Sequence, residues 1–345
     1  MPDEIIVNGR FLGQRMTGVQ RVADEISRRL SVPHRIVRPA RGASGARGHG
    51  WEQFVLPARA RGGLLWSPCN LGPLSVRRQV ITVHDAAVFE HPEWFSPRFG
   101  RVYRGLLPLL AGRVAGLVTV SRFSRDRLAE ALGIAPERIE VVHNGVGEQF
   151  RPTAEVHPAI APIIGGRPYF ATLSTREPRK NLQLVMRAWA RARPRLPGDM
   201  VLLVVGGQGA SAVFGAQGGG ETGHDTDGIV QTGYLPEEAL PSLLSGAHGL
   251  LYPSLYEGFG LPALEAMACG TPAVTTRLTS LPEVCGEDAL YVDPADPDDL
   301  ADVLALLACD PVLRADLGRR GQTRAQQFSW AAAAKRMDEI LTGHL

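Results

Sequence analysis

Two carboxylates, Glu257 and Glu265, stand eight residues apart in a segment whose residue types suit ligand binding. An apolar strand ends near Tyr252, Gly258–Gly260 forms a turn, and Pro262 fits the first turn of a helix, where its missing N–H costs nothing. Glu257 then lies in the loop after the strand, and Glu265 about one turn into the helix. Carboxylate oxygens beside the amides of a helix N-terminus suit a ligand with hydroxyls and phosphates. The competing interpretation is a strand, turn and helix with two solvated glutamates.

A second candidate site is a basic loop that precedes a helix. The expected strand Tyr169–Leu173 is followed by Ser-Thr-Arg-Glu-Pro-Arg-Lys-Asn, and a helix is expected from Asn181. The adjacent cations Arg179 and Lys180 would act at the same place as the helix dipole, which favours a diphosphate. Only positions 180 and 335 are lysine among 37 basic residues, so Lys180 is unusual in this composition. A solvated basic loop is the alternative.

His84 and Asp85 follow the expected strand 79–83. Because the carboxyl ends of parallel strands line the crevice where α/β proteins bind ligands, this pair is a third candidate site. A lone histidine is more often structural, and we assign His143, before the Asn144-Gly145 turn, to packing.

The loop after the first expected strand, 4–8, contains a glycine directly before a helix. A backbone without a side chain at Gly18 can approach a ligand closely, and Thr17 and Arg21 flank it. A plain structural turn is the alternative. The loop lacks the G-x-G-x-x-G fingerprint, and no acidic residue ends the next strand, which argues against a nicotinamide dehydrogenase.

Short apolar segments alternate with helical segments in both halves of the chain, which predicts two doubly wound parallel sheets. The expected strands are 4–8, 34–37, 64–66, 79–84, 117–121 and 139–143, then 169–173, 200–205, 229–232, 249–252, 273–275 and 290–292. The expected helices are 19–30, 96–113, 123–132, 181–192, 236–245 and 261–269, and Asp296 and Ser329 are expected to cap two more. Proline and glycine predict a linker at 151–168, and glycine predicts a loop at 206–227.

Composition argues against several classes of protein. The net charge of +2 gives no general attraction to nucleic acid. No apolar run approaches the roughly 20 residues of a membrane span. The four cysteines, at 69, 269, 285 and 309, lack metal-ligand spacing, and no N-terminal signal is evident. We therefore expect a cytoplasmic protein with reduced thiols, no metal and no nucleic-acid partner.

The expected helix 96–113 mixes four arginines with Phe99, Tyr103 and Leu106. Basic amphipathic helices can lie on anionic membranes, and this one would then contact the inner face of the cytoplasmic membrane. A solvated basic face with a buried apolar stripe is the simpler interpretation.

The segment Tyr-Pro-Ser-Leu-Tyr-Glu-Gly-Phe-Gly-Leu-Pro-Ala-Leu-Glu, residues 252–265, resembles the Glu-x7-Glu signature of retaining glycosyltransferases of family 4. In that family the first glutamate contacts the hydroxyls of the donor sugar and the second holds the nucleotide ribose. The resemblance therefore implies these roles for Glu257 and Glu265. It also implies that the donor is bound by the turn between them, namely Gly258, Phe259, Gly260 and Leu261.

The loop that ends in Glu-Pro-Arg-Lys-Asn is similar to the diphosphate-binding segment of the family. The resemblance implies that Lys180 binds the donor diphosphate and that Arg179 assists it. Many members have an arginine where this chain has Ser174, so Arg176 or Arg21 would have to supply that charge. A bacterial mannosyltransferase-like subset has threonine there, so we keep Ser174 in the donor site.

The string VHDAAVFEHPEWFS, residues 83–96, is similar to that same bacterial subset. In the family the matching histidine lies beside the donor sugar and assists catalysis, so the resemblance implies a catalytic set of His84, Glu257 and Lys180. The glycine-containing loop of the family borders the donor phosphate and the acceptor. We accordingly assign Gly18 to the donor, and we assign Thr17, Arg21 and Asp85 to the acceptor side.

The resemblance covers nearly the whole chain and implies the GT-B fold, in which two facing Rossmann-like domains enclose a deep cleft. Residues 1–160 are expected to form the acceptor domain, together with a C-terminal helix, 330–345, that crosses back to it. Residues 161–329 are expected to form the nucleotide-sugar donor domain.

The resemblance implies sugar transfer with retention of configuration by a front-face displacement, in which the leaving diphosphate takes the acceptor proton. No metal or other cofactor is required. Similarity over 79–95 and 250–285 favours transfer of mannose from GDP-mannose to a saccharide or polyprenyl-linked acceptor in bacterial polysaccharide synthesis. The alternatives are a rhamnose, fucose or glucose donor, a GT-B epimerase or phosphorylase, and a non-catalytic nucleotide-sugar-binding protein.

Overall fold

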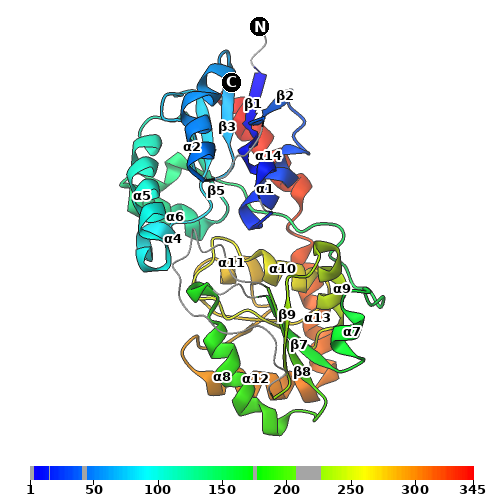
Figure 1. Ribbon diagram of the computed structural model, residues 1–345. Coiled ribbons are helices and arrows are strands. Elements are labelled where there is room, and N and C mark those ends of the chain that lie inside the picture. Colours follow the sequence, from blue (N-terminus) through cyan, green and yellow to red (C-terminus); the bar gives the residue numbers. More distant parts are fainter. Residues whose placement is uncertain (1–3, 15, 41–44, 174–176, 207–226) are drawn as a thin grey trace. The chain divides into compact units, whose positions relative to one another are not determined.

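The computed structural model describes residues 4–14, 16–40, 45–173, 177–206 and 227–345. The chain divides into two compact units, one of Met1–Gly145 with Phe328–Leu345 and one of Val146–Gln327. Each unit contains a six-stranded parallel sheet with helices on both faces, which confirms the expected doubly wound class (Figure 1). Residues 146–160, which the sequence analysis places in the first domain, belong to the second unit.

The first sheet has the strand order β2-β1-β3-β4-β5-β6, and every neighbouring pair is parallel. Residue Ile5 of β1 lies opposite Leu64 of β3. The strands β3 and β4 are buried along their whole length, as strands covered on both faces must be. The bounds are β1 (Glu4–Asn8), β2 (His34–Val37), β3 (Gly63–Ser67), β4 (Gln79–Thr82), β5 (Gly116–Thr119) and β6 (Ile139–Val141).

Helices of the first unit bury their apolar sides against this sheet. Leu107 and Leu110 of α5 and Leu128 of α6 pack in one cluster with Ile81 of β4. The apolar stripe of α5 is therefore part of the core, in agreement with the simpler interpretation of this helix. The bounds are η1 (Gly9–Gly13), α1 (Gly18–Ser27), α2 (Gly45–Phe54), α3 (Leu56–Arg59), α4 (Ala87–Glu90), η2 (Pro92–Trp94), α5 (Pro97–Ala111), α6 (Arg122–Leu132), η3 (Pro136–Arg138) and α14 (Trp330–Gly343).

The last helix, α14, belongs to the first unit, although the second unit precedes it along the chain. Ser329 caps it by accepting a hydrogen bond from the N–H of Ala332 at 3.1 Å, so the expected cap is confirmed. The carboxylate of Asp338 accepts bonds from the backbone N–H and the hydroxyl of Ser31, at 2.8 and 2.6 Å. These contacts fasten α14 to the connection between α1 and β2.

The second sheet has the strand order β12-β11-β10-β7-β8-β9 and is also parallel. Trp189 of α8 and Leu304 of α12 lie in the cluster that covers one face, and Figure 1 shows these two helices side by side. Ile164 of α7 and Leu243 of α9 lie in the cluster on the other face. The bounds are β7 (Tyr169–Leu173), β8 (Val201–Val205), β9 (Ile229–Gly233), β10 (Leu250–Leu251), β11 (Ala273–Thr275) and β12 (Leu290–Tyr291).

The helices of the second unit include several that the sequence analysis does not anticipate. Asp296 caps α12 as expected, accepting from the N–H of Asp298 at 2.9 Å. The short helix α7 lies inside the expected linker, and α11 is new, as is α2 in the first unit. The bounds are α7 (Ala161–Ile164), η4 (Pro178–Lys180), α8 (Leu182–Ala192), η5 (Arg193–Arg195), η6 (Glu237–Ala239), α9 (Leu240–Gly246), α10 (Leu261–Ala268), α11 (Leu281–Cys285), α12 (Pro297–Cys309) and α13 (Pro311–Ala325).

Both sheets have a point beside their first strand where the winding direction reverses. In the first unit the chain goes from β1 to β2 on one side and then returns to β3 on the other side of β1. In the second unit it goes from β7 to β8 and β9, and then returns to β10 on the other side of β7. Open α/β sheets bind ligands beyond the strand ends at such switch points, so each unit has one preferred place for a site.

Within the part of the chain that the structure describes, no helix combines the length and the apolar character needed to cross a bilayer.

Candidate active site

The switch point of the second sheet brings the two strongest candidate segments together. Arg179 and Lys180 end the short helix η4, which follows β7, and Glu257 lies in the loop that follows β10. The two loops are joined through the backbone, because the N–H of Leu255 donates to the carbonyl of Arg179 at 2.7 Å. Residues far apart in sequence thus meet at the carboxyl edge of the sheet.

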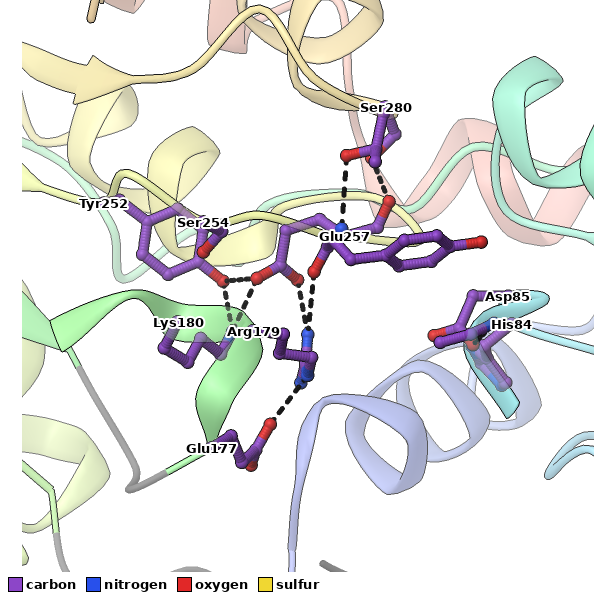
Figure 2. A network of polar contacts seen from close by, with 12 residues as sticks. His84, Asp85, Glu177, Arg179, Lys180, Tyr252, Ser254, Glu257 and Ser280 are labelled. Atoms are coloured by element: carbon purple, nitrogen blue, oxygen red, sulfur yellow. Dashed lines mark hydrogen bonds and ion pairs between the residues drawn. The ribbon is translucent and has the colours of Figure 1, made fainter. Parts of the chain in front are cut away.

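Glu257 is the centre of a buried polar cluster (Figure 2). Its Oε1 accepts from Lys180 Nζ at 2.7 Å and from the hydroxyl of Tyr252 at 2.6 Å. Its Oε2 accepts from Arg179 NH1 at 3.0 Å, and Arg179 Nε donates in turn to Glu177 Oε2 at 2.7 Å. Lys180 also donates to the hydroxyl of Tyr252 and lies 4.6 Å from the centre of its ring.

The backbone of Glu257 is also held by hydrogen bonds. Its N–H donates to Thr279 Oγ1 at 3.2 Å, and its carbonyl accepts from the hydroxyl of Ser280 at 2.8 Å. Both partners lie between β11 and α11, so three loops at the same sheet edge hold the carboxylate in place.

The surroundings set the protonation states of this cluster. Burial alone would raise the pKa of Glu257, but the charges of Lys180 and Arg179 outweigh it and lower that pKa to about 2. Burial and the neighbouring Glu257 raise the pKa of Tyr252 well above its usual range. Glu257 is therefore a carboxylate, and Tyr252 keeps the proton that it donates to it.

The turn and helix after Glu257 form as the sequence predicts. Gly260 has φ of 100°, and a Cβ there would lie 2.8 Å from Leu281 Cδ2, so this position requires glycine. Pro262 occupies the first turn of α10, and Glu265 is buried one turn further on. Gly258, Phe259 and Leu261 are buried beside them. The first turn of α10 thus directs backbone amides to the edge where Glu257 lies.

In the first unit, His84 follows β4 and is buried. Its Nε2 lies 2.8 Å from the carbonyl of Pro68, so Nε2 carries the proton and Nδ1 is the acceptor. Its backbone N–H donates to Asn70 Oδ1 at 2.8 Å. Burial lowers the pKa of His84 to about 4, which keeps the ring neutral near pH 7. A fixed neutral ring with one acceptor nitrogen suits a hydroxyl ligand.

Most of the other candidate residues lie at or near the starts of α1 and α4. Asp85 Oδ1 accepts from the N–H of Ala87 at 3.0 Å, so it stabilises the start of α4. Thr17 precedes α1 with its hydroxyl near Gln20, Gly18 is the first residue of that helix, and Arg21 is half-buried one turn later. Their assignment to substrate stays a prediction. Ser174 and Arg176 lie outside the described residues.

No group of three or more metal-ligating side chains occurs among the residues that the structure describes.

The sequence analysis missed the role of Tyr252, which it takes as the end of an apolar strand. We expect Tyr252→Phe to lower kcat/KM for the donor about tenfold, because its two hydrogen bonds to charged groups, Glu257 and Lys180, are lost. Steady-state kinetics check this. Tyr169→Phe is the matched control, since its buried hydroxyl donates instead to the carbonyl of Leu243 at 2.8 Å. Unchanged donor kinetics in Tyr252→Phe would contradict the assigned role.

The lowered pKa of His84 predicts an acid-labile first unit. A folded-state pKa of about 4, below the usual 6.5, means that the unfolded chain binds more protons between these values. Stability from the neutral ring is thus complete above about pH 6.5 and is lost as the pH falls toward 4, by about 3 kcal/mol. The free energy of unfolding, measured with denaturant at pH 7 and at pH 4, should fall by this amount in the wild type and by less in His84→Gln. Equal losses in both proteins would be evidence against the buried neutral ring.

Comparison with solved structures identifies the class of fold. HepE of Anabaena, solved with UDP and glucose, aligns over 99% of both chains with a TM-score of 0.73 and 16% identity. The lipopolysaccharide glycosyltransferase WaaG also aligns over 99% of both chains, with a TM-score of 0.70 and 15% identity. Together with the two six-stranded parallel sheets, these similarities define the two-domain GT-B fold.

Two family models match the sequence, "Glycosyltransferase Family 4" over residues 49–150 and "Glycosyl transferases group 1" over residues 167–310. O-antigen chain mannosyltransferase B of Escherichia coli is 32% identical over 265 residues, which are 75% of this chain and 68% of that protein. The MMP α-(1→4)-mannosyltransferase of Mycolicibacterium hassiacum is 34% identical over 70% of this chain and 57% of its own length. The matched part of WbdA, a serotype-specific mannosyltransferase of E. coli, is only 32% of that protein. This chain belongs to glycosyltransferase family 4, which confirms the resemblance noted in the sequence.

Proposed function

We propose that this protein transfers mannose from GDP-mannose to a saccharide or polyprenyl-linked saccharide acceptor, with retention of configuration, in the synthesis of a bacterial polysaccharide. The observation that carries the proposal is the buried cluster of Glu257, Lys180, Arg179 and Tyr252 at the switch point of the second sheet. It offers a carboxylate for sugar hydroxyls and two cations for a diphosphate, side by side.

The ion pairs of this cluster hold the site in a defined geometry. Lys180 and Arg179 are held by Glu257, so a bound diphosphate must take over or share these cations. The carboxylate of Glu257 then becomes available to the hydroxyls of the donor sugar. Because these groups are held by surrounding hydrogen bonds, little reorganisation is needed when charge develops on the leaving phosphate.

The leaving group is proposed to be stabilised by fixed positive charge. Lys180, Arg179 and the amides at the N-terminus of α10 would bind the phosphate oxygens. No metal is then needed, since two cations and a helix dipole supply the charge. The leaving diphosphate oxygen would take the acceptor proton, and the oxocarbenium-like state would lie between the leaving and the attacking oxygen on one face of the sugar.

The choice of mannose rests on the relatives. The first matches include an O-antigen chain mannosyltransferase, a mycobacterial mannosyltransferase and a serotype-specific mannosyltransferase. His84 is proposed to accept a hydrogen bond from a sugar hydroxyl through Nδ1. A polyprenyl-linked acceptor would bring the enzyme to the inner face of the cytoplasmic membrane.

The test is a transfer assay with GDP-mannose and short mannose-containing acceptors, with and without EDTA. We expect release of GDP together with a longer saccharide, whose new linkage is α by NMR, and no effect of EDTA. UDP-glucose and dTDP-rhamnose serve as comparison donors. A β linkage, a requirement for a divalent metal, or GDP release without transfer to any acceptor would contradict the proposal.

A further inference from the structure

The switch point of the first sheet, between β1 and β3, also contains a buried polar cluster, and none of its residues has a role in the site described above. Asn8 is the last residue of β1 and Ser67 the last of β3. Arg10 lies in η1, directly after β1, and His49 and Glu52 lie on α2. In the second unit the equivalent position holds the cluster of Glu257 and Lys180, so the first unit is expected to use this position in the same way.

Glu52 is the centre of this cluster, and only 1% of its side chain is exposed. Its Oε1 accepts from Asn8 Nδ2 at 2.7 Å and lies 3.4 Å from Arg10 Nε. Asn8 Nδ2 is also 3.5 Å from Ser67 Oγ. The two buried positions of α2 are Gly48 and Glu52, so this helix presents a carboxylate to the sheet where an apolar side chain would be usual.

The second oxygen of this carboxylate, Oε2, is buried and accepts no hydrogen bond from any residue that the structure describes. His49 Nδ1 lies 3.6 Å from this oxygen. That nitrogen also lies 3.3 Å from Arg10 NH1, which can only donate, so Nδ1 accepts there and has no proton for Glu52. A buried carboxylate oxygen without a donor is destabilising, and the group that would satisfy it is a hydrogen-bond donor.

The environment of Oε2 also indicates the kind of ligand. A phosphate would be repelled by the carboxylate, whereas a neutral hydroxyl can donate to it. His49 Nδ1 lies 3.6 Å from Oε2 and 36% of the His49 side chain is exposed, so movement of this ring would expose Oε2 to a ligand. The cluster therefore suits a neutral polyhydroxyl molecule.

We propose that the end of β1 and β3 is the acceptor-saccharide subsite, in which Glu52 Oε2 accepts a hydrogen bond from a sugar hydroxyl once His49 moves aside. Asn8 and Arg10 hold the carboxylate in place and balance its charge. This inference rests on the proposed transferase function and adds to it the residue that recognises the acceptor.

The experiment measures binding of methyl α-D-mannopyranoside to the whole protein by saturation-transfer NMR, with GDP binding measured separately by calorimetry. We expect a clear saccharide signal from the wild type and at least a fivefold weaker signal from Glu52→Gln. GDP affinity should change less than twofold, because the substitution lies in the other unit. Glu287→Gln is the matched control in the second unit, because that carboxylate pairs with Arg277 on the surface, and it should keep the saccharide signal.

A second pair of variants keeps the test valid if Glu52→Gln folds poorly. His49→Trp leaves the contact between Glu52 and Asn8 intact but blocks the path to Oε2, so it should abolish the signal. His49→Ala loses the same imidazole contacts without blocking the path and should retain the signal. An unchanged signal in Glu52→Gln and His49→Trp, or no signal from the wild type, would overturn the subsite. Loss of GDP binding by the wild type would instead count against the proposed donor.

Discussion

Replacing Lys180 with alanine is expected to lower turnover about a hundredfold, and at least tenfold. Lys180 contacts both Glu257 and Tyr252. It is the cation that we propose to stabilise charge on the leaving diphosphate. Removing one preorganised donor of this kind typically costs about 3 kcal/mol in the barrier. The measurement is kcat with saturating donor and acceptor.

The control for this variant is the only other lysine of the chain. Lys335→Ala removes an exposed ammonium group from α14, in the first unit, and should leave kcat unchanged. Circular dichroism should show both variants folded. Turnover of Lys180→Ala within threefold of the wild type would be incompatible with a role of this residue at the diphosphate.

Replacing Glu257 with glutamine is expected to lower activity at least as much as replacing Lys180 with alanine. The amide can hydrogen-bond one partner, but it cannot balance the charges of Lys180 and Arg179, and its NH₂ group would face donors. The variant would lose the proposed contact with the donor sugar, and the two cations would no longer be held in place. We expect kcat/KM for the donor to fall at least a hundredfold, as measured with limiting donor.

Glu257→Gln is also expected to change how the free energy of unfolding depends on pH in the acid range. The folded-state pKa of Glu257 is about 2, below the usual 4.5, so its stabilisation is complete above about pH 4.5 and is lost as the pH falls toward 2. Between pH 6 and pH 3 the wild type should lose about 2 kcal/mol that Glu257→Gln does not lose. Glu287→Gln is the control, because that carboxylate pairs with Arg277 on the surface. Equal acid sensitivity of the wild type and Glu257→Gln would argue against the buried ion pairs.

The fold could be predicted because its signals are local. Each parallel strand is a short apolar run, and the caps Asp296 and Ser329 bond backbone groups only two or three residues away. The same holds for the segment from Gly258 to Glu265, where one glycine turn and one proline define a helix start. The helix α2 could not be predicted, because Gly45, Gly48 and Gly50 lower its helix propensity and it lacks an apolar stripe.

The chemistry of the site is less visible in the sequence because its contacts join distant segments. Tyr252 in an apolar strand indicates a core residue, and only the fold brings its hydroxyl to Lys180, 72 positions away. The tautomer of His84 depends on the carbonyl of Pro68, in a different loop. Nothing in the sequence indicates that Glu52 is buried, since its burial depends on the packing of α2 against β1. Long-range pairing of this kind requires the three-dimensional structure.

The measurement that tests the central claim most directly is a thermal-shift series with GDP, GDP-mannose, UDP and dTDP, each with and without EDTA. A ligand at a hundred times its dissociation constant adds about 2.7 kcal/mol of stability, enough for a clear shift. The cluster at the switch point of the second sheet predicts stabilisation by GDP and GDP-mannose that does not depend on metal. If no nucleotide diphosphate stabilises the protein, or if stabilisation disappears with EDTA, Lys180, Arg179 and Glu257 do not form the donor site described above.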